Sequence, residues 1–213
     1  MIKDENEYYR HTLELLEESY LEANSQGDVA GGSGSSGGLG RWEKKRRVLA
    51  SAFDHDGCWL DVGCANGLLM ETLTQWTGEA GLRIEPYGLD LSARIADAAR
   101  RRLPLWADRI WTGNVMTWEP LTRFDYVTVI ADCVPRCARA ELVDRLIVKF
   151  LKASGRLIFS IYIPRPPEAP VELPPASAVL KRFGYEVTGE AEARIEGALK
   201  VSVAWLDVHG QHK

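Results

Sequence analysis

The sequence predicts an α/β fold in which a doubly wound, mostly parallel sheet of seven strands is covered by helices and ends in an antiparallel hairpin. The first observation is the regular alternation of strand-like and helix-like segments from residue 58 to residue 162. This alternation is typical of parallel sheets, because each helix returns the chain to the start of the next strand. The second is a pair of strand-like runs, 185–193 and 198–208, joined by the short link Arg194-Ile195-Glu196-Gly197. A link this short joins antiparallel neighbours.

Length and composition limit the class of protein. A chain of 213 residues with 46% hydrophobic residues is long enough for one α/β domain and an accessory segment. The net charge of −4 weighs against a nucleic-acid partner but leaves room for a local basic patch. No segment reaches the roughly 20 apolar residues of a membrane span, and the polar N-terminus is unlike a signal peptide. The absence of such a span predicts no membrane partner. The cysteines lack metal-ligand spacing, so we expect no metal, and free thiols in a reducing cytoplasm. They are Cys58, Cys64, Cys133 and Cys137.

The most informative stretch is a strand, a loop of small residues and a helix. Trp59-Leu60-Asp61-Val62 is typical of a buried strand, and apolar residues recur at helical spacing after the loop. In the loop, Gly63, Ala65 and Gly67 stand at every second position, whereas a dinucleotide site has G-x-G-x-x-G. Backbone amides of such a loop approach a ligand closely. The stretch therefore predicts a Rossmann-like nucleoside site of another kind.

The D-x-G-x-(G/A)-x-G spacing resembles the first motif of the class I S-adenosylmethionine (SAM)-dependent methyltransferases, especially bacterial enzymes that act on small molecules. The resemblance covers approximately residues 41–208 and rests also on an acid after the second strand, on Gly113-Asn114-Val115, on Phe124-Asp125 and on the hairpin. It implies SAM as the cofactor and S-adenosylhomocysteine (SAH) as the product. The loop residues that it assigns to the cofactor are Asp61, Gly63, Cys64, Ala65, Asn66 and Gly67.

Two further positions are predicted to contact the nucleoside. Asp90 ends the second strand about 23 residues after the loop, the spacing expected of a carboxylate that binds ribose hydroxyls. A helix cap is the alternative for Asp90. Leu91 would then pack against adenine. The resemblance also implies that Asn114 and Val115 contact adenine, although an Asn beside Gly is equally typical of a turn.

The carboxyl end of the fourth strand, predicted at 124–130, is the expected site of methyl transfer. Here the resemblance gives Ala131 to the cofactor and Asp132, Cys133 and Arg136 to the substrate, with Asp132 as a general base or positioning residue. A capping or ion-paired loop Asp is the alternative. We then expect a helix over 141–151, a turn at Ser154-Gly155 and a fifth strand over 155–162 that ends at the substrate residue Tyr162.

Residues 1–40 are predicted to form an N-terminal unit ahead of the SAM-binding domain at 41–213. Tyr9, Leu13, Leu16 and Tyr20 form an apolar stripe in a helix over 6–23, which either packs on the core or closes the site as a lid. The Gly/Ser-rich stretch within 24–40 predicts a flexible flap, or an engineered linker. The proline-rich segment 164–175 is expected to be extended and to form one wall of the substrate pocket. In the lid interpretation, the aromatic substrate contacts are Tyr8, Tyr9 and Tyr20.

The helix that starts at 41 is basic and is either a solvated face or a second cofactor element. In related methyltransferases one residue here reaches the methionyl carboxylate of SAM, which points to Trp42 and Arg46. The predicted function is methyl transfer to a small-molecule acceptor by in-line displacement, mainly through proximity and desolvation. The alternatives are an RNA methyltransferase that uses the basic runs 44–47 and 100–102, and a SAM-binding module without turnover.

Overall fold

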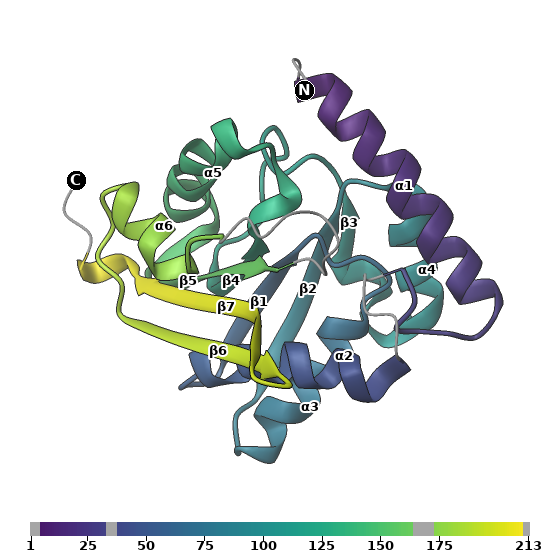
Figure 1. The fold of residues 1–213 in the computed structure, drawn as a ribbon, viewed down its shortest axis with the longest axis horizontal. Coiled ribbons are helices and arrows are strands. Elements are labelled where there is room, and N and C mark those ends of the chain that lie inside the picture. Colours follow the sequence, from purple (N-terminus) through teal and green to yellow (C-terminus); the bar gives the residue numbers. More distant parts are fainter. Residues whose placement is uncertain (1–4, 33–37, 164–172, 211–213) are drawn as a thin grey trace.

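A computed structural model describes residues 5–32, 38–163 and 173–210 of the chain. Seven strands form one sheet in the order β3-β2-β1-β4-β5-β7-β6, in which the first five along the chain are parallel and β7 is antiparallel to both its neighbours (Figure 1). The predicted fold class is confirmed. The strands are β1 (Gly57–Val62), β2 (Ile84–Asp90), β3 (Ile110–Thr112), β4 (Phe124–Ile130), β5 (Leu151–Tyr162), β6 (Gly189–Ile195) and β7 (Ala198–Asp207). The α-helices are α1 (Glu5–Ser25), α2 (Gly38–Arg46), α3 (Leu68–Glu79), α4 (Ala93–Arg102), α5 (Arg139–Arg145) and α6 (Ala176–Arg182).

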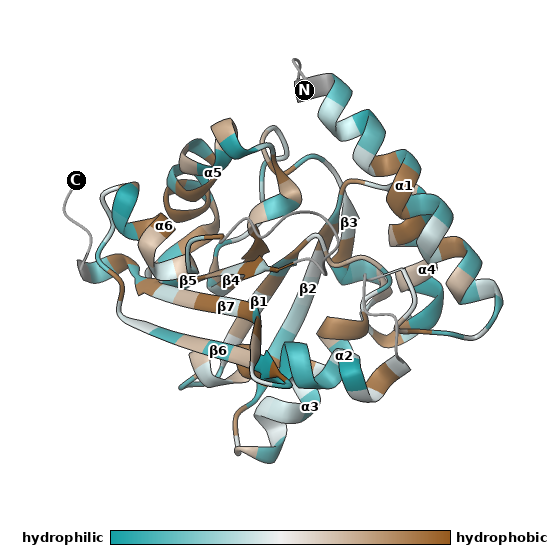
Figure 2. Cartoon of the chain, in the orientation of Figure 1, coloured by the Kyte–Doolittle hydropathy of each residue, from teal (hydrophilic) through white to brown (hydrophobic). Residues whose placement is uncertain are grey.

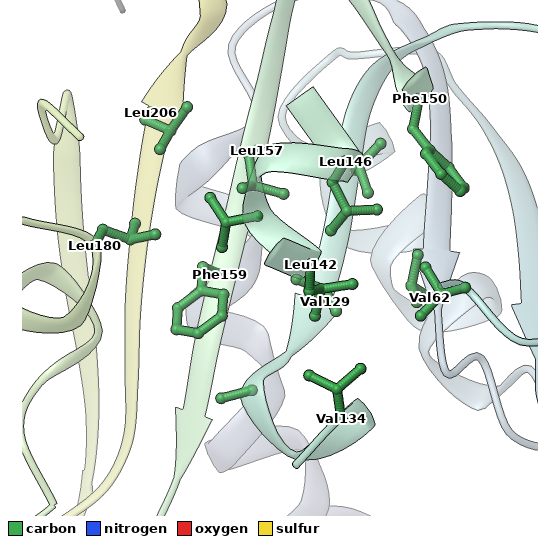
Figure 3. Packing of buried hydrophobic residues seen from close by; sticks show 14 of the residues in the cluster. Val62, Val129, Val134, Leu142, Leu146, Phe150, Leu157, Phe159, Leu180 and Leu206 are labelled. Carbon is green, nitrogen blue, oxygen red and sulfur yellow. The ribbon is translucent and has the colours of Figure 1, made fainter. Parts of the chain in front are cut away.

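Helices cover both faces of the sheet. On one face, Leu142 of α5 lies beside Val129 of β4 and near Phe159 of β5 (Figure 3), and Phe150 of the π-helical turn Leu146–Phe150 belongs to the same buried cluster. On the other face, α2, α3 and α4 pack in a second buried cluster around Trp59. Because β4 is covered on both sides, five of its seven residues are buried and the other two are partly buried. This two-sided burial holds the carboxyl ends of β1, β2 and β4 in fixed positions relative to one another.

Two local predictions are wrong. Ser154-Gly155 does not form a turn but lies within β5, which begins at Leu151. The pairing of β4 with β5 shifts register here, and a Cβ on Gly155 would come within 3.0 Å of the carbonyl oxygen of Phe124. The glycine therefore allows the two strands to approach closely, because it has no Cβ. A turn selects glycine for its conformational freedom, so the residue alone does not distinguish the two situations. The second wrong prediction is the start of the strand expected over 185–193. This strand, β6, begins at Gly189, and Tyr185 instead packs in the core beside α6.

The terminal hairpin is confirmed, with a tighter turn than expected. Only Glu196 and Gly197 separate β6 from β7, and both have positive φ, 53° and 78°. This is the backbone conformation of the two-residue turns that match the right-handed twist of paired strands.

Helix α1 lies along one side of the molecule and packs against α4 (Figure 1). Figure 2 shows polar and apolar residues mixed along α1, in contrast to the largely apolar β7. None of the helices in the described part of the chain is long and apolar enough to cross a membrane. Residues 33–37 of the predicted flap and 164–172 of the predicted pocket wall lie outside the described residues.

Candidate functional site

A cavity of about 410 Å³ opens at the carboxyl ends of the parallel strands, beneath α1. Val62, Asp90, Ile130 and Tyr162, the last residues of β1, β2, β4 and β5, all line it. Open α/β sheets bind their ligands at this end. A smaller cavity of about 50 Å³ adjoins it and shares part of its lining. The shared residues are Tyr20, Arg46, Gly63, Ala65 and Ile130.

The loop after β1 takes its shape from small residues and a set of hydrogen bonds. Gly63, Ala65 and Gly67 all have positive φ, and a Cβ on Gly63 would lie 2.9 Å from the Sγ of Cys133. Asn66 ties the loop to its surroundings, since its Nδ2 donates to the Val29 carbonyl (2.9 Å) and its Oδ1 accepts from the Leu68 amide (3.2 Å). Its carbonyl accepts from Arg102 Nε (2.8 Å), and the Ala65 amide donates to Asp90 Oδ2 (2.8 Å). The loop is therefore fixed beside the cavity.

Asp90 is held at the cavity by backbone donors. Its Oδ1 accepts from the Ser92 amide (2.9 Å) and its Oδ2 from the Ala65 amide. Ser92, rather than Asp90, caps α4, because its Oγ accepts from the Ile95 amide (3.1 Å). Burial raises the pKa of Asp90, while the two amides act in the opposite direction. Each oxygen keeps a further lone pair for a ligand hydroxyl.

Arg46 is a buried cation with unused donor capacity. Its residue is 7% exposed, and its Nη1 is buried without a hydrogen-bond partner in the described structure. The guanidinium carbon lies 3.7 Å from the ring centroid of Tyr162, while Trp42 lies farther away at 5.9 Å. The solvated-face interpretation is thus wrong for Arg46, although it holds for Lys44 and Arg47. A desolvated guanidinium of this kind strongly favours an anionic partner.

Asp61 lies at the smaller cavity as a buried carboxyl group. Its Oδ1 accepts from Thr128 Oγ1 (2.8 Å), and the same Thr128 oxygen accepts from Trp59 Nε1 (2.9 Å). Burial raises the pKa of Asp61 to about 7, and the nearby Arg46 only partly offsets this. The carboxyl group therefore changes charge near neutral pH.

This pKa predicts a pH-dependent stability difference between the native chain and Asp61→Asn. A raised pKa means that the folded state holds its proton more tightly, so the stabilisation is present below the unfolded value of 3.8 and is lost as pH rises through about 7. The native chain should lose stability relative to the variant by up to about 1.4 kcal/mol per pH unit in this window. Urea unfolding of both proteins at pH 5 and pH 7.5 measures this, and a constant difference would contradict it.

Asp132 lines the cavity but is engaged in an ion pair. Its Oδ1 lies 2.5 Å from Arg139 Nη2, and its side chain is 59% exposed. Arg139 Nε also donates to the Ala131 carbonyl (2.9 Å), and the Tyr8 hydroxyl donates to the Asp132 carbonyl (2.8 Å). The ion-paired loop Asp that the sequence left open is what the structure contains.

The structure brings most of the predicted site residues together at the two cavities. Four do not line them: Gly67 shapes the loop, Ala131 is wholly buried in the core, Arg136 is exposed, and Tyr8 contacts only the rim. Those that do are Tyr9, Tyr20, Trp42, Arg46, Asp61, Gly63, Cys64, Ala65, Asn66, Asp90, Leu91, Asn114, Val115, Asp132, Cys133 and Tyr162.

Other lining residues were not predicted. Thr12, Leu13 and Leu16 of α1 form much of the roof, and Leu13 and Leu16 carry a sequence signal, since they belong to the apolar stripe. At the adenine position, Asn114 Oδ1 accepts from the Met116 amide (2.9 Å), as in the turn that the sequence left open. The Asn114 side chain therefore serves a turn while it lines the cavity.

Comparisons with known proteins identify the fold. No family model and no curated protein sequence matches the chain. A SAM dependent methyltransferase from Aquifex aeolicus is similar over 79% of this chain and 92% of its own, with a TM-score of 0.53 and 16% identity. A mitomycin 7-O-methyltransferase is similar over 78% of this chain, with a TM-score of 0.55 and 20% identity. A [4+2]-cyclase is similar over 75%, with a TM-score of 0.55 and 15% identity. The chain spans 54% and 63% of the lengths of the last two.

Proposed function

We propose, from the premise that this chain has the fold of the class I SAM-dependent methyltransferases, that it binds SAM and transfers the methyl group to a small molecule. The observation that carries the proposal is the buried guanidinium of Arg46, whose Nη1 lacks a partner. It lines a cavity that also contains the Asp90 carboxylate and a loop with three positive-φ residues. One anionic group and one diol would satisfy these two charged side chains, and SAM carries both.

The residues present fit the parts of this cofactor. Arg46 would bind the carboxylate of the methionine part, and Asp61, at the same small cavity, would bind its ammonium group. Asp90 would accept from the ribose hydroxyls. Adenine would lie between Leu91 and Val115, both of which line the larger cavity beside Asn114. The structures with this fold that carry the methyltransferase name support the assignment.

Bound SAM would supply an already activated sulfonium methyl group, so the protein's task is alignment and exclusion of water. Tyr9, Leu13 and Leu16 of α1 give the cavity an apolar wall that excludes water. The described residues that line the larger cavity include neither His nor Lys. This composition favours an acceptor that is itself a competent nucleophile and is small enough to fit under α1.

In this scheme Asp132 orients the acceptor from the cavity rim, with Arg139 fixing its carboxylate. Asp132→Asn should lower turnover about 10-fold and leave the affinity for SAH unchanged, because this scheme assigns the side chain to the acceptor and not to SAM. Steady-state kinetics and calorimetry measure the two quantities. Equal turnover in both proteins would remove Asp132 from the mechanism.

The RNA alternative receives little support from the basic runs. Arg47 pairs with Glu43 and Glu79, Arg100 with Asp97, and Arg102 with Glu71. The paired carboxylates partly neutralise these cations, so they attract a phosphate backbone less strongly. A function other than methyl transfer has one observation in its favour, since one structure of similar fold is named a [4+2]-cyclase.

The test is the small-molecule content and affinity of the purified full-length protein. We expect native mass spectrometry to detect bound SAM or SAH, and calorimetry to give one SAH site per chain. No affinity for SAH at millimolar concentration would overturn the proposal. Binding of SAH without SAH formation from SAM across a broad panel of phenol, thiol and amine acceptors would favour the binding module.

A further inference from the structure

Helix α1 covers the cavity without being part of the core. No α1 residue whose side chain is described is fully buried, and the apolar stripe of Tyr9, Leu13, Leu16 and Tyr20 faces the cavity. The segment that follows α1 is fixed more firmly, since Ala30 is wholly buried and the Val29 carbonyl accepts from Asn66. The helix is therefore anchored most firmly near its carboxyl end, while near its amino end the Tyr8 hydroxyl donates one exposed hydrogen bond to the Asp132 carbonyl. Between these points, the apolar stripe gains further hydrophobic contact when a ligand fills the cavity.

Glu17 is the main polar tie between the middle of α1 and the body of the protein. Its Oε1 accepts from Ser92 Oγ (2.5 Å), and its Oε2 lies 3.2 Å from Arg94 Nη1. The Glu17 side chain is only 22% exposed, whereas Arg94 is 69% exposed. The Ser92 bond is therefore the better shielded of the two contacts and the one with more energetic weight.

Ser92 connects this tie to the residue assigned to the ribose. Its amide donates to Asp90 Oδ1, and its hydroxyl accepts from the Ile95 amide while donating to Glu17. The amide and the hydroxyl of Ser92 therefore both form hydrogen bonds within this network. The position of α1 and the orientation of the chain after Asp90 are linked through one side chain.

We propose that Glu17 is a positioning residue that latches α1 over the cavity and slows release of the bound nucleoside. This inference rests on the proposed function for the identity of that nucleoside, SAM or SAH. When the Glu17–Ser92 bond breaks, the amino end of α1 is still held by the exposed hydrogen bond from the Tyr8 hydroxyl to the Asp132 carbonyl, but the middle of the helix is freer to move about its anchored carboxyl end. Leu13 and Leu16 then leave the cavity together, because both precede Glu17 on the same helix. Removal of the latch therefore increases the rate of ligand dissociation more than it changes the rate of association.

The test compares Glu17→Ala with Glu17→Gln and with the control Glu18→Ala in the full-length protein. Glu18 is the exposed neighbour on α1. In ligand-free protein, hydrogen exchange of α1 amides should be about 10-fold faster in Glu17→Ala, as expected from loss of a charge-assisted hydrogen bond. Glu17→Gln keeps an acceptor for Ser92 and should restore most of the protection, while Glu18→Ala should match the native chain.

A second measurement uses SAH itself. Stopped-flow displacement should show SAH leaving Glu17→Ala about 10-fold faster, with an association rate within about twofold of the native value. Equal α1 exchange in Glu17→Ala and Glu18→Ala would overturn the latch. Absence of SAH binding to the native chain would instead overturn the proposed function, and the exchange experiment would still decide the latch.

Discussion

Arg46→Met is expected to weaken SAH binding by at least about 100-fold. A buried guanidinium that lacks a partner for Nη1 can give a ligand carboxylate two charge-assisted hydrogen bonds of about 1.5–3 kcal/mol each. Methionine keeps most of the side-chain volume against Tyr162 but supplies neither charge nor donors. Calorimetry with SAH measures the loss.

The matched control is Arg47→Met, the adjacent residue on the exposed side. Arg47 forms ion pairs with Glu43 and Glu79 and does not line either cavity, so SAH affinity should remain within about twofold. Adenosine provides a second control, because it lacks the amino-acid part of SAH and its affinity should not depend on Arg46. A loss of less than about fivefold for SAH in Arg46→Met would show that this guanidinium does not bind the ligand.

Asp90→Ala is expected to weaken both SAH and adenosine by about 100-fold. Ribose hydroxyls that donate to a buried carboxylate lose two charge-assisted bonds, and the Ala65 and Ser92 amides lose their acceptor. Because these amides belong to the protein, the variant should also unfold at a lower temperature than the native chain. Calorimetry with each ligand, together with a thermal scan, separates the two effects.

Asp97→Ala serves as the control for Asp90→Ala. Asp97 is an exposed residue of α4 that pairs with Arg100, so its removal should change neither ligand affinity nor stability by much. Arg46→Met and Asp90→Ala together locate the two ends of the ligand. Arg46→Met should weaken binding of SAH alone, and Asp90→Ala should weaken binding of both SAH and adenosine. If Asp90→Ala binds adenosine as the native chain does, the ribose lies elsewhere.

The fold was predictable because its signals are local. Strand β4 is predicted at 124–130 and observed as Phe124–Ile130, since its β-branched and aromatic residues suit burial on both faces. The error at Gly155 has an equally clear reason. A glycine is required both in turns and where two strands approach closely, and only the pairing of β4 with β5 distinguishes these situations.

The candidate site was predictable where the backbone itself fixes the direction of a side chain. Asp90 ends a strand at the edge where the other strands also end, so its place beside the loop follows from spacing and topology. Ala131 and Arg136 lie beyond the end of β4, where a short helical turn decides which residue faces the cavity. No periodicity in the sequence describes such a turn, so Asp132 and Cys133 line the cavity and those two do not.

The sequence by itself determined the alternation of strands and helices, the small-residue loop and the acidic residue after the second strand, because each follows from hydrophobic period, glycine position or spacing along the chain. Only the tertiary structure decided that Arg46 is buried with no hydrogen-bond partner for Nη1, that Asp132 pairs with Arg139, and that Glu17 reaches Ser92. The physical reason is that burial and partners of a charged side chain depend on elements far away in the sequence. Glu17 and Ser92 are 75 residues apart, and only the packing of α1 on α4 brings them into contact.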